Sequence, residues 1–431
     1  MAVMSDAATG YPSGALKFAG QAHHAARGQR TLIAIVQVMA LAVWFSASAV
    51  VPSLQLEWQI SPAAAVWITA STQVGFVLGA LASALANLAD RLRPDWLLAW
   101  AAGGAAASTA VFALWTNDLA IAVLLRFATG VFLAGVYPVG MKLMASWSSP
   151  AQRGRAFGLL IGALTLGSAL PHLIGAFQLP WQAVLLVAAC VTLGGGILCA
   201  AAVRPGPLFE SRSVRLDPGF VLRLLRNRAQ RLVNISYFGH MWELYALWTW
   251  LPSFMLASHS QTSQSGWSIG ATVFFCIGVA GVAGCVIGGW AADRHGRAKT
   301  AGLSLALSGA CCLASVAAFN APWPVLAVFA SLWGAAVIAD SGVFSTLLTE
   351  VTEPEHVGTA LTLQTSLGFL VTIVSIQIVP VISGLVGWQY AFLVLFAGPL
   401  AGVAALSRLR LLHVETRSRP IVGATRARLA K

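Results

Sequence analysis

The hydrophobic positions of the chain are gathered in long apolar runs separated by short polar connections. A helix that crosses a bilayer needs about 20 mostly apolar residues, and twelve runs reach this length. They are predicted as transmembrane helices over Thr31–Leu54, Ala63–Leu88, Trp96–Trp115, Leu119–Trp147, Ala156–Phe177, Gln182–Val203, Leu232–Leu256, Ser268–Ala292, Ala301–Phe319, Val325–Leu348, Ala360–Val381 and Tyr390–Leu406. The pattern indicates an all-α integral membrane protein with six spans in each half.

Composition agrees with this prediction, because 58% of the residues are hydrophobic, 9% are charged and the mean hydropathy is +0.78. A soluble globule of 431 residues needs more polar surface than this. The six cysteines lie inside apolar runs, where they are expected to pack as small side chains, and only two of the eight histidines, His23 and His24, are adjacent. We therefore expect neither a metal site nor a cofactor.

The net charge of +12 follows membrane topology. Lys and Arg occupy the two tails, the central connection and the loops after even-numbered spans, whereas the opposite loops hold none. Because basic residues near span ends stay on the cytoplasmic side, we expect both termini to be cytoplasmic in a bacterial-type inner membrane, and no nucleic acid as partner. Residues Met1 to Arg30 lack a cleavable signal pattern, so the first span is expected to direct targeting.

The dipeptide Asp-Arg occurs at the end of two spans, as Asp90-Arg91 and Asp293-Arg294, which are 203 residues apart (293 minus 90). This spacing is close to half the chain and indicates a duplication. We predict a tail over 1–30, six-helix bundles over 31–203 and 232–411, a basic linker over 204–231 and a second tail over 412–431. Asp217-Pro218 in the linker predicts the start of a helix on the membrane surface, although a plain charged linker explains the composition equally well.

The segment from Gly289 to Lys299 resembles the signature of the major facilitator superfamily. The resemblance implies two pseudo-symmetric six-helix bundles, alternating access to a midplane site, and a cytoplasmic gate in which the first glycine lets two helices approach closely. The matching gate positions are Asp90, Arg91, Gly289, Asp293, Arg294, Gly296 and Arg297. The alternative is a charged loop that only obeys the topology rule.

Arg126 is the one basic residue well inside a predicted span. The run from Arg126 to Gly130 resembles the fourth-segment pattern of the same superfamily, which implies a place near the proton-coupling machinery. The alternative is pairing with a polar kink of the backbone. The fifth span lacks the Gly-Pro pair of typical drug antiporters, which weakens an antiporter interpretation.

Two buried acids and a histidine are the other candidates for proton coupling. His240 and Glu243 are three residues apart and share a helix face, so they are expected either to titrate as a pair or to form a static hydrogen bond. Asp340 lies among small residues in the tenth span, where we expect it to join a central cavity or to cap a broken helix. With Arg126, these residues form the predicted coupling set.

Other polar and aromatic side chains within spans are candidates for a substrate cavity. They are Gln37, Trp44, Gln73, Tyr137, His172, Tyr237, Trp242 and Gln364. Each alone is equally explained by packing, but together they give the apolar interior enough polar groups for a midplane site.

We expect a proton-coupled secondary transporter of a small organic solute that is neutral, cationic or monoanionic. Spans two and eight carry no Lys or Arg in their cores, which disfavours an inorganic anion. The Trp44-Phe45-Ser46 run is loosely similar to the cyanate and nitrite-like branch. The alternative is a proton-driven efflux antiporter of drugs or metabolites.

A membrane enzyme or a non-transporting receptor is a more remote alternative. The chain lacks a nucleophile or paired carboxylates at catalytic spacing, a large soluble region and an ATP-binding loop. The expected partners are therefore the solute, protons and membrane lipid, with a monomeric transporter that uses a gradient.

Overall fold

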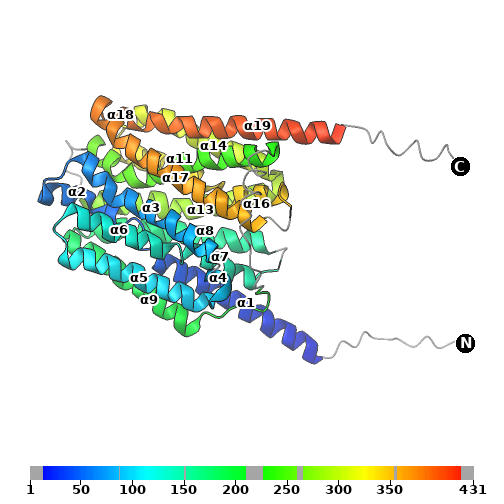
Figure 1. The fold of residues 1–431 in the computed structure, drawn as a ribbon. Helices are drawn as coiled ribbons and strands as arrows, with labels where there is room; N and C mark the ends of the chain where they lie inside the picture. Colours follow the sequence, from blue (N-terminus) through cyan, green and yellow to red (C-terminus); the bar gives the residue numbers. More distant parts are fainter. Residues whose placement is uncertain are drawn as a thin grey trace, which may run out of the picture.

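The computed structural model describes residues 13–86, 88–149, 152–209, 227–259, 266–353 and 357–418, and within this part every regular element is a helix (Figure 1). The first bundle, as we call the helices before residue 210, consists of α1 (Ser13–Ala40), α2 (Ser46–Trp58), α3 (Pro62–Leu85), α4 (Leu88–Arg91), α5 (Pro94–Trp115), α6 (Leu119–Leu133), α7 (Tyr137–Ser146), α8 (Arg153–Ala176) and α9 (Trp181–Ala202).

The second bundle follows residue 226. It consists of α11 (Arg228–Ser258), α12 (Gly266–Phe274), the π-helical turn η1 (Phe275–Val279), α13 (Ala280–His295), α14 (Arg297–Ala318), α15 (Trp323–Ile338), α16 (Ser341–Glu350), α17 (Val357–Val386), α18 (Trp388–Ala391), the 3-10 turn η3 (Phe392–Phe396) and α19 (Ala397–Ser418). The surface helix predicted at Asp217 lies outside the described residues.

Ten helical segments of the described chain are long and apolar enough to cross a membrane, and they coincide with ten of the twelve predicted spans. The other two predictions fall on α1 with α2 and on α11. The first of these is broken at Leu41–Phe45. The second is one continuous helix, but His240, Glu243 and many aromatic side chains lower its hydropathy.

The duplication is visible in the helix boundaries. Helix α14 begins and ends 203 residues after α5 (297 minus 94; 318 minus 115). The broken spans α6–α7 and α15–α16 are displaced by 204 residues at both ends (323 minus 119; 350 minus 146). Both bundles also pair their helices alike, with α5 on α9 and α14 on α19. The two halves therefore repeat one architecture.

Glycines bring the second and fourth spans of each bundle into close contact. In the first bundle, a Cβ at Gly130 would collide with the backbone of Thr72 in α3. In the second, a Cβ at Gly288 would collide with the carbonyl of Ala339, and one at Gly334 with the carbonyl of Cys276. Such contacts between small residues allow membrane helices to pack tightly.

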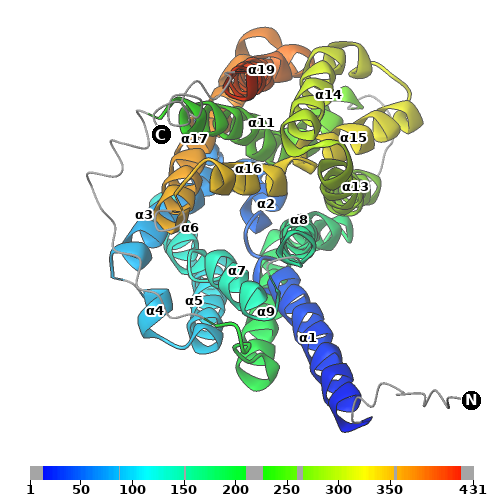
Figure 2. The ribbon, with the colours of Figure 1, turned by 90° about the vertical axis from the view of Figure 1, so that its right-hand side faces the viewer.

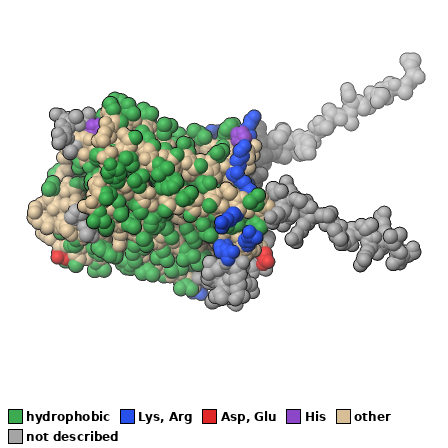
Figure 3. Space-filling model, turned by 90° about the horizontal axis from the view of Figure 1, so that it is seen from above, with side chains coloured by type: hydrophobic (Ala, Val, Ile, Leu, Met, Phe, Trp, Pro, Cys, Tyr) green, Lys and Arg blue, Asp and Glu red, His purple; other side chains and the backbone are tan. Residues whose placement is uncertain are grey.

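The two bundles lie side by side when the molecule is viewed along its helices (Figure 2). They meet where α3 packs on α17 and where α8 packs on α12 and α13. Lys and Arg side chains gather at the end of the molecule where α1 begins and α19 ends, and apolar side chains cover the flank between the ends (Figure 3). This arrangement is typical of a protein that crosses a bilayer.

Candidate transport site

The break in the first span is held by Arg126. Residues Leu41–Phe45 leave the α-helical pattern, and the carbonyl of Val43 accepts a hydrogen bond from Nη2 of Arg126 at 3.1 Å as well as one from the Ser46 hydroxyl at 2.9 Å. Nη1 of the same guanidinium donates to the Ser46 hydroxyl at 3.0 Å. Arg126 is fully buried, and no described carboxylate forms an ion pair with it. The contacts match the interpretation of this arginine as the partner of a backbone kink.

An aromatic cluster joins the two bundles next to this break. It consists of six buried side chains: Trp44, Phe45 and Phe76 from the first bundle, and Tyr245, Trp248 and Phe369 from the second. The Phe76 and Phe369 rings are 4.4 Å apart between centroids, and Phe45 stacks on Tyr245 at 5.8 Å. Trp248 meets Phe45 edge-on, as Tyr245 meets Phe369, and aromatic rings prefer such offset and edge-on contacts. We call this group the interbundle aromatic cluster.

Several polar atoms around the cluster have no hydrogen-bond partner among the described residues. They include Nε1 of Trp44 and Trp248, both amide atoms of Gln73, and Nε of Arg126; the amide of Gln37, which lies beside Gly140 of α7, also lacks a partner. A buried polar group without a partner costs about 1–3 kcal/mol, and native structures contain few of them. Their concentration near the junction of the bundles marks it as a candidate binding region.

The break in the tenth span places an acid in the core of the second bundle. Helix α15 ends at Ile338 and α16 begins at Ser341, with Asp340 between them. The side chain of Asp340 forms no capping bond; its Oδ1 lies 2.8 Å from Nδ1 of His240 on α11. Nε2 of His240 is 2.8 Å from the Ser341 hydroxyl. Both ring nitrogens therefore face the broken span.

Glu243 occupies a separate cage of hydrogen-bond donors. Its carboxylate accepts from Nε1 of Trp333 at 2.7 Å, from the hydroxyl of Ser308 at 2.8 Å and from Sγ of Cys312 at 3.4 Å. The expected pair of Glu243 with His240 is wrong. The two side chains lie on one face of α11, but tertiary packing turns the carboxylate toward α14 and α15 and the imidazole toward α16.

The remaining cavity candidates lie in different parts of the two bundles. Tyr137 begins α7 at the second broken span of the first bundle, and the Tyr237 ring lies 6.0 Å from Phe344 in the second bundle. Trp242 donates to the Val394 carbonyl at 3.1 Å, and Gln364 donates to the Asn234 side chain at 2.9 Å. These two bonds are internal to the second bundle, so they favour packing roles. His172 is buried in α8, whose backbone contacts α12 at Gly270.

The sequence did not single out several side chains that complete these groups, and four of them make the central contacts. Phe76 and Phe369 belong to the aromatic cluster, and Ser308 and Trp333 bind Glu243. Helical spacing offers a signal for one of them. Phe76 lies three residues after Gln73 on α3, so it shares a face with a predicted site residue.

The predicted gate is centred on the loop between α13 and α14. Gly296 has a φ of +93°, which ends α13, and Arg297 at the start of α14 forms an ion pair with Glu350 at the end of α16. Asp293, Lys299 and Arg410 line a hollow of about 700 Å³ beside this pair. The side chain of Asp90 lies outside the described residues, and Arg91 is exposed.

The close-approach role expected for Gly289 is wrong. A Cβ at Gly289 would meet nothing within 4 Å, whereas one at the preceding Gly288 would meet the backbone of Ala339. The neighbour therefore makes the contact, because a shift of one residue rotates a position by about 100° around the helix.

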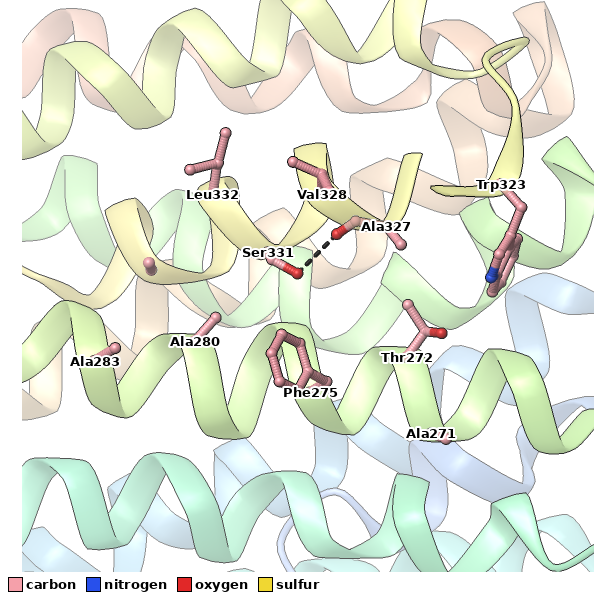
Figure 4. Close-up of a pocket in the computed structure, with 11 residues that line it drawn as sticks. Ala271, Thr272, Phe275, Ala280, Ala283, Trp323, Ala327, Val328, Ser331 and Leu332 are labelled. Carbon is pink, nitrogen blue, oxygen red and sulfur yellow. Dashed lines mark hydrogen bonds between the residues drawn. The ribbon is translucent and has the colours of Figure 1, made fainter. Parts of the chain in front are cut away.

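A second hollow of about 700 Å³ lies between α15 and the α12–α13 segment (Figure 4). Its lining is apolar except for Thr272 and Ser331, and the Ser331 hydroxyl is already bonded to the Ala327 carbonyl at 2.7 Å. Phe275, Val328 and Leu332 in its wall are more than half exposed, which places the groove on the apolar flank. It is therefore separate from the site between the bundles.

Comparison with known proteins agrees with the architecture. A family model described as Major Facilitator Superfamily matches residues 33–287 and 233–430. A crystal structure of a mutant of the nucleoside transporter NupG covers 88% of this chain and 99% of its own, with a TM-score of 0.68 and 14% identity. A bacterial homolog of the human lysosomal transporter Spinster, in an inward-facing conformation, covers 90% and 95% with a TM-score of 0.66 and 12% identity.

Curated relatives share more sequence over shorter stretches. The putative niacin/nicotinamide transporter NiaP of Bacillus subtilis is 28% identical over 51% of this chain and 56% of its own length. The gallate transporter of Pseudomonas putida is 24% identical over 61% and 64%, and the niacin transporter NiaP of Acinetobacter baylyi is 24% identical over 58% and 63%. The chain thus matches about three fifths of the length of these relatives, and their names give no support to the cyanate and nitrite-like branch.

Proposed function

Because the chain belongs to the Major Facilitator Superfamily, we propose that it is a secondary active transporter that carries a small organic solute by alternating access and couples this movement to protons. The curated relatives support the class of cargo, since they are named for small organic solutes that include niacin and gallate. The chain performs no covalent chemistry in this proposal. It acts as a monomer in an inner membrane, in contact with lipid.

The distribution of charge supports an orientation. Lys and Arg gather at the end that holds the start of α1 and the end of α19. Basic residues remain on the cytoplasmic side of bacterial membranes. Both described ends of the chain are therefore cytoplasmic in our proposal, and the Arg297–Glu350 pair belongs to the inner gate.

The buried pair of His240 and Asp340 carries the proposal of proton coupling. Both side chains are 1% exposed, and charged groups at this depth are costly unless they are paired. A proton gained by Asp340 removes the charge of its carboxylate and weakens its attraction to His240. Asp340 sits in a helix break, so its protonation state is mechanically linked to the geometry of α15 and α16.

Glu243 supplies a second group that can exchange a proton. Its three donors stabilise the ionised form, while complete burial opposes the charge. A change in the spacing of α11, α14 and α15 alters the number of donors that reach the carboxylate. Rocking of one bundle against the other is then able to change the proton affinity of Glu243, which is the requirement for coupling.

Reconstitution into proteoliposomes tests the function. An imposed pH gradient, with the membrane potential clamped, is expected to drive uphill movement of a labelled solute from a panel of small organic acids, amides and amines. Accumulation on the alkaline side indicates symport, and accumulation on the acidic side indicates the antiport of an efflux protein. Movement that stops at equal concentrations under every gradient would contradict proton coupling.

A further inference from the structure

The interbundle aromatic cluster and its unpaired polar atoms are not used by the proton-coupling groups. Asp340 is paired with His240, and Glu243 is held by Trp333 and its neighbours. The cluster instead lies at the break of α1 and α2, which Arg126 anchors. Its shape, polarity and charge each indicate a property of the transported molecule.

The shape of the cluster indicates a planar ring. Three rings come from each bundle, and the pairs that cross the junction, such as Trp44 with Phe369 at 5.7 Å and Phe45 with Tyr245 at 5.8 Å, contact one another directly. When the bundles separate, these rings lose partners. A flat aromatic solute restores ring contacts on both sides, because aromatic pairs add about 0.5–1.5 kcal/mol beyond burial of area.

The polarity of the unpaired groups indicates an acceptor. Indole nitrogens are donors only, and Nε1 of both Trp44 and Trp248 lacks a partner. Gln73 lies one turn before Phe76 on α3, and Trp248 lies one turn after Tyr245 on α11. Because α3 runs toward the end with the termini and α11 runs away from it, both groups lie on the same side of the rings.

The charge of Arg126 indicates an anion. The guanidinium is fully buried, and among the described residues it bonds only to a carbonyl and a hydroxyl and leaves Nε unpaired. These bonds flank Trp44 and Phe45 in sequence, so the charge lies at the edge of the aromatic cluster. A buried cation without a counter-ion is unfavourable, and a carboxylate brought by the solute supplies the missing charge.

From these observations we infer that the solute is a planar aromatic carboxylate. Its ring inserts between the rings of the two bundles, and its carboxylate accepts hydrogen bonds from Trp44, Trp248 and Gln73 near the charge of Arg126. The inference rests on the proposed transport function and names the cargo of that same junction. Aromatic cations and polyols are disfavoured, because the unpaired groups are mainly donors beside a positive charge.

Binding to the purified full-length protein tests the inference. The probes are benzoate, cyclohexanecarboxylate, benzylammonium and benzyl alcohol. They are similar in size and differ in whether they contain an aromatic ring and in the sign of their charge. Benzoate is expected to raise Tm and to bind at least about tenfold more tightly than each of the others. Equal binding of cyclohexanecarboxylate would overturn the aromatic part of the inference, and tighter binding of benzylammonium would overturn the anionic part.

Variants with matched controls locate the site. Trp248→Phe keeps an aromatic ring, although a smaller one, and removes the donor. Gln73→Leu removes an amide that has no partner among the described residues, so neither variant is expected to unfold the protein. Each should weaken benzoate binding about tenfold or more, which corresponds to one lost hydrogen bond to a charged group. Trp58→Phe is the control. The indole nitrogen of Trp58 is also buried without a partner among the described residues, but its ring packs against Phe112 and Trp181 within the first bundle.

The outcomes separate this inference from the proposed function. Unchanged benzoate affinity in Trp248→Phe and Gln73→Leu, or equal losses in Trp58→Phe, would overturn the location. Proton-driven transport of another solute without binding of benzoate would overturn the inference and leave the function standing. Benzoate binding without any gradient-driven transport would contradict the function while supporting the assignment of the ligand.

Discussion

Nδ1 of His240 and Oδ1 of Asp340 lie 2.8 Å apart in the core of the second bundle. The two residues come from a continuous helix and from a break between two helices. The pair therefore connects a rigid span to one that is already interrupted. In our proposal, a proton that reaches this pair changes the charge at a point where the helix is already interrupted.

Replacement of Asp340 by asparagine is expected to abolish uphill transport and to leave exchange of solute between the two sides. The amide keeps the size of the carboxylate but carries no charge and neither gains nor loses a proton, so the contact with His240 no longer responds to pH. Uptake and counterflow in proteoliposomes measure the two activities, and Tm in detergent measures stability.

Asp118→Asn is the matched control for this change. Asp118 is an exposed N-cap that accepts hydrogen bonds from the backbone of Ala120 and Ile121, and asparagine caps helices equally well. This variant should transport normally. Normal uphill transport in Asp340→Asn as well would remove the His240–Asp340 pair from coupling.

Substitution of Glu243 by glutamine should keep a side chain that accepts hydrogen bonds from its neighbours and should remove the group that exchanges a proton. The amide oxygen still accepts from Trp333, so the fold is retained, but the side chain no longer gains or loses a proton. We expect gradient-driven accumulation to disappear and the rate of counterflow to become independent of pH. Glu57→Gln is the control, because Glu57 also accepts from an indole, that of Trp181, outside the second bundle.

Adjacent glycines in α13 should respond differently to alanine. Gly288→Ala places a Cβ against the backbone of Ala339 and overpacks the contact between α13 and α15, at a cost of roughly 1–3 kcal/mol. Gly289→Ala meets open space and gains helix propensity of about 1 kcal/mol. Thermal unfolding in detergent should give a lower Tm for the first variant only; equal losses would contradict the packing described here.

The ion pair of Arg297 and Glu350 should control turnover more than stability. Both side chains are more than one third exposed, and exposed pairs contribute about 0–1 kcal/mol. Charge reversal of either residue is expected to slow transport, and the double reversal Arg297→Glu with Glu350→Arg should recover most of the rate. A double variant as slow as the singles would show that the pair is not a gate.

Apolar runs were sufficient to predict most of the fold, because a bilayer imposes a minimum length on every span. The three breaks within spans were harder to predict. Leu41–Phe45 is as apolar as its surroundings, and the bond from Arg126 of another span to the Val43 carbonyl could not be foreseen from this stretch alone. Asp340 was a partial exception, since a break was one of its two expected roles.

Local spacing along the sequence did not predict which residues contact His240 and Glu243. Three residues separate His240 from Glu243, which suggested a pair on one face of a helix. The actual partners, Asp340 and Trp333, are about 90 to 100 positions away in sequence. Such contacts depend on how α11 is rotated within the bundle, and a single sequence does not specify that rotation.

Proton movement that accompanies the solute is the most direct test of the central claim. A pH-sensitive dye trapped in proteoliposomes reports it, with the membrane potential clamped and a solute gradient as the only driving force. The account predicts a change of internal pH that requires both solute and protein and that is lost in Asp340→Asn and Glu243→Gln. Solute flux through the wild-type protein without any change of pH would contradict it.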